Sequence, residues 1–236
     1  LWCAPAGIAV AKSLDGRCDV TVVERKVTYH NNIAALRGVF DPAIRWQQFI
    51  GYKGVFGKSP KPSSRVVNAE VVRVEEKAVH LHNGETLSYD FLVIATGSQN
   101  PFPGKLDSLQ SVPEGIKRYE DMSKLIEKAS RIVIVGGGPV GVELAGEIRA
   151  FHPKTEVTII HRGANLLSNQ GGAPQLPQRF LNTVTTTLRN QGVTLLLGDS
   201  VQEAPEPQGY AEGERTITTS RSEEHTSEPS HRTISY

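Results

Sequence analysis

Residues 131–146 read RIVIVGGGPVGVELAG, in which a β-branched run ends abruptly in glycines and passes at once into a helical pattern. Gly136, Gly138 and Gly141 have the spacing G-x-G-x-x-G. In a strand–turn–helix unit, the first glycine allows a tight turn, the second lets the backbone approach a pyrophosphate, and the third lets helix and strand pack closely. The phosphates would lie at the helix N-terminus, where free N–H groups and the helix dipole favour negative charge.

The sequence on both sides of the glycines supports this interpretation. Val140, Leu144 and Ile148 share one stripe of the predicted helix, and a second β-branched run follows at Glu156–Ile160. Strand, helix and strand together make the βαβ unit of a Rossmann-type dinucleotide-binding domain. The alternative is a glycine-rich turn that binds no ligand, because the motif alone is weak evidence.

A second unit of the same kind opens the sequence. Residues 5–11 predict the first turns of a helix, and Asp19–Glu24 predict a buried strand that ends in a carboxylate. Gly7 is the one glycine of this motif that stands at its expected position. Glu24 lies about where a carboxylate binds an adenosine ribose hydroxyl, although an ordinary surface glutamate at a strand end is the alternative. The sequence therefore indicates an α/β protein with two Rossmann-type units.

The charge and cysteine content exclude several classes of function. The 236 residues contain 26 basic and 25 acidic side chains, so we expect no nucleic-acid partner. Cys3 and Cys18 cannot build a disulfide framework or a zinc site, and they lack the C-x-x-C spacing of a redox dithiol. We interpret them as free thiols in a reducing compartment.

The remaining pattern predicts further strands and helices around the two units. An Asn-Gly pair at Asn83-Gly84 predicts a hairpin turn, and Pro101–Gly104 predicts a non-helical linker. Strands are predicted at Arg65–Val74, Ala78–Leu81, Tyr89–Gly97 (a buried strand) and Val193–Leu197, and helices at Tyr119–Ala129 and Gln178–Gln191.

The C-terminal residues have a different character. Residues 221–228 read RSEEHTSE and resemble the peptide encoded by a common sequencing adapter. Such a polar, unpatterned segment cannot bury enough apolar surface to order itself. We interpret the chain from about Ser220 onward as an assembly artefact, and a genuine disordered tail is the alternative.

Several short motifs occur in a familiar order along the chain. They are Pro5–Ala9, Asn32–Arg37, Leu92–Ser98, Pro101–Lys105, Tyr119–Met122 and Val133–Gly146. In these motifs, from about Pro5 to Thr219, the sequence resembles the apoptosis-inducing-factor-like FAD/NAD(P)H oxidoreductases. The resemblance implies an α/β fold of glutathione-reductase type, with an incomplete FAD domain at 1–100, a linker and connecting helix at 101–129 and an NAD(P)H domain at 130–219. The non-native or disordered tail inferred above would then occupy 220–236.

The resemblance also assigns cofactor-binding residues. Arg37 would contact the flavin nucleotide, the backbone of Val71 would bind the adenine edge, and Glu143 would join the NAD(P)H site. An acid in a first helical turn is also favoured by the helix dipole alone, which is the alternative for Glu143. The predicted FAD site comprises Gly7, Glu24, Arg37, Val71, Thr96 and Gly97, and the predicted NAD(P)H site comprises Gly136, Gly138, Gly141, Glu143, His161 and Arg162.

His161 and Arg162 follow the second strand of the NAD(P)H unit, with no carboxylate beside them. A carboxylate at this point binds the 2′-hydroxyl of NADH, whereas an arginine accepts the 2′-phosphate of NADPH. We therefore expect NADPH to be tolerated at least as well as in a family that uses both nucleotides.

The resemblance implies hydride transfer from NAD(P)H to flavin and electron delivery to a quinone-type acceptor. The flavin carries such chemistry, so no catalytic residue and no metal ligand is predicted. A non-catalytic nucleotide-binding signalling protein of the same fold is the alternative. By family resemblance we expect a cytoplasmic protein at a membrane, lipid-droplet or mitochondrial outer surface, attached through segments outside this sequence; its oligomeric state is not predicted.

Overall fold

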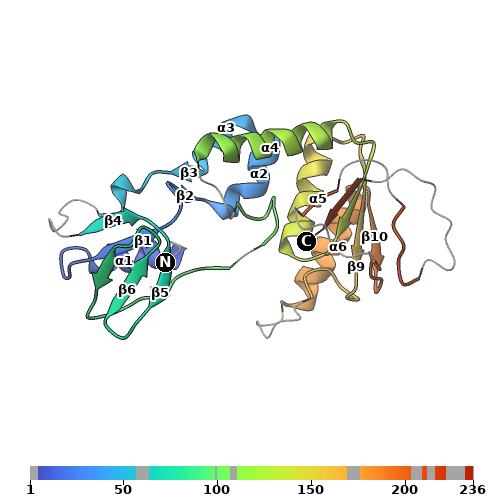
Figure 1. Ribbon diagram of the computed structural model, residues 1–236. Helices are drawn as coiled ribbons and strands as arrows, with labels where there is room; N and C mark the ends of the chain where they lie inside the picture. The colour runs from blue at the N-terminus through green and yellow to red at the C-terminus, as the bar shows by residue number, and fades with distance from the viewer. Residues whose placement is uncertain are drawn as a thin grey trace. The chain divides into compact units, whose positions relative to one another are not determined.

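The computed structural model describes residues 5–56, 64–98, 100–106, 111–168, 176–202, 209–211, 216–221 and 232–235. The chain forms two compact units. Unit 1 comprises Leu1–Asn31, Gln47–Gln99 and Asp107–Gly115, and unit 2 comprises Asn32–Trp46, Asn100–Leu106 and Ile116–Tyr236. Figure 1 shows the elements of each unit with their labels.

Unit 2 is built on a parallel sheet of four strands in the order β10-β9-β8-β11. The strands are β8 (Arg131–Val135), β9 (Glu156–His161), β10 (Val193–Leu197) and β11 (Arg232–Ser235), with helices α5 (Pro139–Phe151) and α6 (Gln178–Asn190) between them. β-branched runs suit this sheet because parallel strands are covered on both faces. Ile134, Leu144 and Ile159 are fully buried at the centre. The predicted βαβ unit is confirmed.

Helix α4 (Val112–Glu127) begins seven residues before the predicted start at Tyr119. A capping box explains the difference, since the backbone N–H of Ser111 donates to Glu114 Oε2 at 3.1 Å and that of Glu114 donates to Ser111 Oγ at 3.4 Å. The predicted linker Pro101–Gly104 packs against this helix, with the buried ring of Phe102 5.2 Å from that of Tyr119.

Residues 32–46 carry η1 (Asn32–Ala34), α2 (Ala35–Phe40) and most of α3 (Pro42–Gln47). They cluster with unit 2, although the expected boundary at residue 100 placed them with the FAD domain. Arg45 is buried and donates to the carbonyl oxygens of Gly38 at 2.8 Å and Val39 at 3.1 Å. These bonds hold the corner between α2 and α3.

Unit 1 combines helix α1 (Pro5–Leu14) with three small sheets. Strand β1 (Thr21–Glu24) pairs in parallel with β4 (Arg65–Asn68), and β5 (Val71–Val74), β6 (Ala78–Leu81) and β7 (Thr86–Ser88) form an antiparallel meander. β2 (Tyr29–His30) pairs with β3 (Phe49–Ile50), and a single turn, η2 (Tyr52–Gly54), follows. Val23, Ala69, Val79 and Leu81 form the core of the unit.

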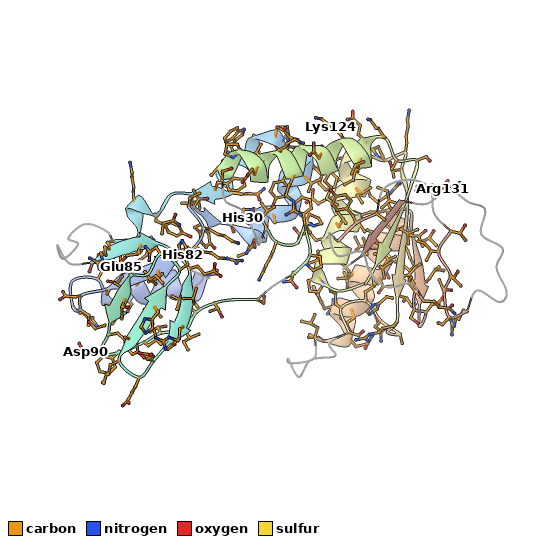
Figure 2. The ribbon with its side chains drawn as sticks, viewed as in Figure 1. His30, His82, Glu85, Asp90, Lys124 and Arg131 are labelled. Carbon is orange, nitrogen blue, oxygen red and sulfur yellow. The ribbon has the colours of Figure 1, made fainter. Side chains whose placement is uncertain are left out.

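The predicted hairpin turn is confirmed between β6 and β7. Gly84 has φ +86°, and the Asn83 side chain accepts the N–H of Glu85 at 3.1 Å. Figure 2 labels His82 and Glu85 on this turn. The predicted long strand at Arg65–Val74 is two strands, because the chain turns at Ala69-Glu70 to join a second sheet.

The predicted buried strand at Tyr89–Gly97 is wrong. The segment forms no ladder with any described strand, and Phe91 and Ile94 are 92% and 68% exposed. Its apolar sequence has strand character, but a strand forms only where a neighbour accepts and donates its backbone hydrogen bonds. Tyr89 and Leu92 of this segment pack against the core of unit 1.

The expectation of an unstructured tail is corrected for the parts that the structure describes. Arg232–Ser235 form β11 beside β8, in register from Ile132 to Val135. The Ser220 hydroxyl donates to Asp199 Oδ1 at 2.7 Å, which ties this residue to the end of β10. β-branched Thr233 and Ile234 favour a strand once β8 offers a free edge. Residues 222–231 lie outside the described residues.

Within the described ranges, no helix is both long enough and apolar enough to cross a membrane.

Candidate nucleotide-binding site

Between β8 and α5, the backbone geometry requires glycine at two of the three predicted positions, Gly136 and Gly141. Gly136 has φ +112°, a conformation that favours glycine, and its N–H donates to the carbonyl of Ile160 at 2.8 Å. A Cβ on Gly141 would lie 2.0 Å from the Gly136 carbonyl oxygen. Helix and strand therefore approach as closely as the motif predicts.

Gly138 leaves space for a ligand. It is the N-cap of α5, no side chain caps the helix there, and Pro139 occupies the first turn. A Cβ on Gly138 would meet no described atom within 4 Å. The N-terminus of α5 is therefore uncapped by a side chain and uncrowded at its N-cap, an arrangement that suits the pyrophosphate of a dinucleotide.

His161 supports this loop from the end of β9. Its Nδ1 accepts the N–H of Gly137 at 3.1 Å, and its Nε2 lies 3.1 Å from Ser168 Oγ. Because Nδ1 is an acceptor, the neutral ring carries its proton on Nε2 and donates it to Ser168. Burial is the main cause that lowers the pKa of His161, with the charge of Arg162 acting in the same direction, while a hydrogen bond with the Asn165 backbone opposes both.

Gly137 was not among the predicted residues, yet it is closely constrained. A Cβ there would lie 2.5 Å from Leu166 Cδ2 and 3.0 Å from His161 Cγ. The Gly137 carbonyl also accepts the N–H of Leu167 at 2.8 Å. The signal available in the sequence was the run of three consecutive glycines, because the motif does not require its middle member.

Arg162 and Glu143, two further predicted residues, are both exposed. Arg162 follows β9 with an exposed side chain, and Glu143 lies in the second turn of α5. Partial burial is the main cause that raises the pKa of the Glu143 carboxyl, the charge of Glu147 adds to it, and that of Arg37 opposes it. Among the described residues, no cluster of side chains could hold a metal ion.

Comparison with known proteins identifies the family. The family model for pyridine nucleotide-disulphide oxidoreductases matches residues 3–227. The chain belongs to this family. Family membership supports the predicted cofactors, FAD and NAD(P)H, and the predicted α/β fold.

Curated relatives show which members of the family this chain resembles. Ferroptosis suppressor protein 1 of Xenopus tropicalis is 34% identical over 90% of this chain and 54% of its own length, and that of Homo sapiens is 35% identical over 85% and 52%. Apoptosis-inducing factor homolog A of Dictyostelium discoideum is 33% identical over 86% and 49%. These matches confirm the resemblance predicted from the motifs. The chain spans about half the length of the curated relatives it matches.

Solved structures share the fold. NDH2 of Plasmodium falciparum in complex with NADH has a TM-score of 0.67 at 16% identity, over 96% of this chain and 52% of that one. The water-forming NADH oxidase of Lactobacillus brevis bound to NADH has a TM-score of 0.57 at 22% identity, over 97% and 50%.

In unit 1, the predicted FAD residues lie at the ends of strands, in the first turn of a helix and in an exposed segment. Gly7 lies in the first turn of α1, and Glu24 closes β1 as a buried residue whose carboxylate accepts the N–H of Lys26 at 3.0 Å. Val71 opens β5, and Thr96-Gly97 lies in the exposed segment after β7, with φ +71° at Gly97. The end of β1 and the start of α1 are where a Rossmann unit binds ribose and phosphate.

Arg37, the sixth predicted FAD residue, belongs to unit 2. Its Nε donates to Glu147 Oε1 of α5 at 2.8 Å. Sequence reasoning missed Glu147, because a contact between residues 110 positions apart leaves no local signal.

Proposed function

We propose that this chain is part of an FAD-dependent NAD(P)H oxidoreductase that passes electrons to a quinone-type acceptor. The observation that carries the proposal is the open space at Gly138, above the uncapped N-terminus of α5 and between closely packed glycines. FAD, when bound, accepts a hydride from NAD(P)H and passes the two electrons on.

This chain's own residues would bind and orient the nicotinamide dinucleotide. The first turn of α5 offers N–H groups to the pyrophosphate, and the His161–Gly137 bond holds the loop that presents them. Arg162 is exposed beside the loop, where it would pair with a 2′-phosphate. A structural neighbour supports this reading: an engineered water-forming NADPH oxidase bound to NADPH (TM-score 0.59, 22% identity) carries substitutions that remove an aspartate and introduce arginines.

The cysteine content and the family resemblance favour a quinone over a disulfide as the electron acceptor. Cys18 is free and exposed, and the sequence offers no closely spaced cysteine pair to pass electrons to a disulfide. A quinone takes up two electrons and two protons, so it can accept what a reduced flavin delivers. Because such acceptors dissolve in lipid, the proposal includes a protein that works at a membrane surface, and the family resemblance suggests the cytoplasmic side.

The test uses the protein that contains this chain together with its complete FAD domain. NADPH and NADH oxidation is followed at 340 nm with a short-chain ubiquinone analogue, and quinol formation is measured in parallel. We expect one quinol per NAD(P)H consumed. Binding of NAD(P)H without turnover would instead favour the non-catalytic signalling protein.

A further inference from the structure

The loop that follows β9, residues 163–168, lies against the glycine loop, Gly136–Gly138, between β8 and α5. The backbone N–H of Leu167 donates to the carbonyl oxygen of Gly137 at 2.8 Å, and the side chain of Leu166 is fully buried. A Cβ on Gly137 would lie 2.5 Å from Leu166 Cδ2, so the two loops are in close contact. Helix α5, which follows the glycine loop, packs against β9 in the same compact unit (Figure 1).

The ring of His161 joins the two loops through both of its nitrogens. Nδ1 accepts the N–H of Gly137 at 3.1 Å, and Nε2 lies 3.1 Å from Ser168 Oγ. Neutral imidazole has two tautomers, and only the one that carries its proton on Nε2 leaves Nδ1 able to accept. Ser168 Oγ accepts this Nε2 proton, and the Asn165 backbone also hydrogen-bonds with the ring. The serine therefore favours the tautomer that the glycine loop needs.

The place of the Ser168 hydroxyl depends on a glycine in the same loop. A Cβ on Gly163 would lie 2.4 Å from Ser168 Oγ and 2.8 Å from His161 Nε2. Gly163 does not have the positive φ of Gly136, so its backbone conformation does not itself require glycine. Glycine is needed at this position because a side chain would occupy the space in which the hydroxyl meets the ring.

We propose that Ser168 is a positioning residue for the nicotinamide dinucleotide, because it holds the ring of His161 that in turn holds Gly137. The inference rests on the proposed function, which supplies the dinucleotide. Gly137 immediately precedes Gly138, the N-cap of α5, so a shift of Gly137 moves the N–H groups that would bind the pyrophosphate. Ser168 acts on the ligand only through the ring and the glycine loop.

The same bond makes dinucleotide binding sensitive to pH. A protonated imidazole donates from both nitrogens, so its Nδ1 cannot accept the N–H of Gly137. The groups that act on the ring are the Gly137 N–H, the Ser168 hydroxyl, the Asn165 backbone and the Arg162 charge. Because only the neutral ring makes the bond to Gly137, its contribution to affinity is complete above the pKa of His161 and is lost as pH falls through that pKa.

The first experiment observes the tautomer of His161 in the 236-residue chain without any ligand. Long-range ¹H–¹⁵N correlation spectra distinguish a protonated ring nitrogen from one that accepts, and His161→Phe assigns the signals. We expect the parent to carry its proton on Nε2, and Ser168→Ala to populate the Nδ1-protonated form as well. Ser130→Ala, which removes an exposed hydroxyl just before β8, is the matched control and should leave these signals unchanged. A ring that keeps its tautomer in Ser168→Ala would overturn the proposal.

The second experiment measures NADH affinity by the fluorescence of the nucleotide between about pH 5.5 and 8. NADH is the probe because it lacks the 2′-phosphate of NADPH, a group that itself titrates at about pH 6. We expect Ser168→Ala to weaken NADH binding about fivefold at the upper end of this range. The affinities of the two proteins should converge as His161 becomes protonated, and Ser130→Ala should follow the parent. A loss of affinity that stays constant across the range would indicate a merely structural role and overturn the proposal.

Two further variants test whether the effect passes through the ring. Gly163→Ala, whose methyl group would displace Ser168 Oγ, should reproduce Ser168→Ala in both measurements. In a His161→Phe background, Ser168→Ala should have little further effect on NADH affinity, and an equal loss in both backgrounds would contradict the inference. A parent chain that binds no NADH would overturn the proposed function, and with it the ligand named here. NADH binding that Ser168→Ala does not weaken would count against Ser168 alone.

Discussion

At the scale of single residues, a methyl group on Gly141 would lie 2.0 Å from the Gly136 carbonyl oxygen, whereas one on Gly146 of the same helix would meet no described atom within 4 Å. Gly141→Ala should therefore force the loop open, lower the free energy of unfolding by about 2 kcal/mol and weaken NADPH binding. Gly146→Ala is the control and should raise stability by about 0.5 to 1 kcal/mol, because alanine favours a helix. Thermal unfolding and NADPH titration measure both. A Gly141→Ala protein that melts with the parent would contradict the close packing.

Arg162 carries the second prediction at this scale. Its exposed guanidinium would meet the 2′-phosphate that distinguishes NADPH from NADH. Arg162→Glu should weaken NADPH binding about tenfold more than NADH binding, because it replaces an attraction by a repulsion. Arg179→Glu, the same charge change at an exposed site on α6, should affect both nucleotides equally and weakly. The ratio of the two dissociation constants decides the matter. An unchanged ratio in Arg162→Glu would remove Arg162 from the site.

At the scale of elements, the contact between the end of β9 and the glycine loop depends on a neutral His161. Because burial lowers its pKa in the fold, the neutral form is favoured over protonation. This contribution to stability is therefore complete above the ordinary pKa of histidine and is lost as pH falls through the lower pKa of the folded state. The groups that face the ring are the N–H of Gly137, the Ser168 hydroxyl, the Asn165 backbone and the Arg162 charge.

The expected result is a pH-dependent difference between the parent and His161→Phe. The free energy of unfolding should differ most near neutral pH, where the Gly137 N–H loses its acceptor in the variant. The free energies of unfolding of the two proteins should converge as pH falls and the imidazole of the parent becomes protonated. Urea unfolding at a series of pH values measures this, with the His161 titration followed by NMR. A gap that stays constant across the titration would show that the ring's protonation does not matter to the loop.

How far the sequence predicts the structure depends on how local each element's stabilisation is. The β8–α5–β9 unit and the turn at Asn83-Gly84 are encoded by residues close in sequence, and both form as predicted. Tyr89–Gly97 has the composition of a strand, but its state depends on a neighbour that composition does not reveal. The Arg37–Glu147 and Gly137–His161 contacts join residues 110 and 24 positions apart, so only the folded structure brings them together.

At the scale of the whole molecule, the two compact units do not follow the order of the chain. Residues 32–46 precede most of unit 1 in sequence yet pack with α5 in unit 2, through the contacts of Arg37 and Phe40. The boundary expected at residue 100 divides the chain into two consecutive parts, so it does not assign residues 32–46 to unit 2.

The last prediction concerns the C-terminal strand, which completes the sheet of unit 2. β8 pairs with β9 on one side and with β11 on the other, so removal of β11 leaves the backbone groups of Ile132 to Val135 unpaired along one edge. A chain that ends at Arg221 should unfold about 5 °C lower than the parent and aggregate more readily, because an exposed edge strand pairs with other chains. A chain that lacks only Tyr236, which follows β11, is the control and should behave as the parent. Calorimetry and light scattering measure the two effects. If truncation at Arg221 leaves both unchanged, β11 does not stabilise the sheet, and these residues are better interpreted as an unstructured tail.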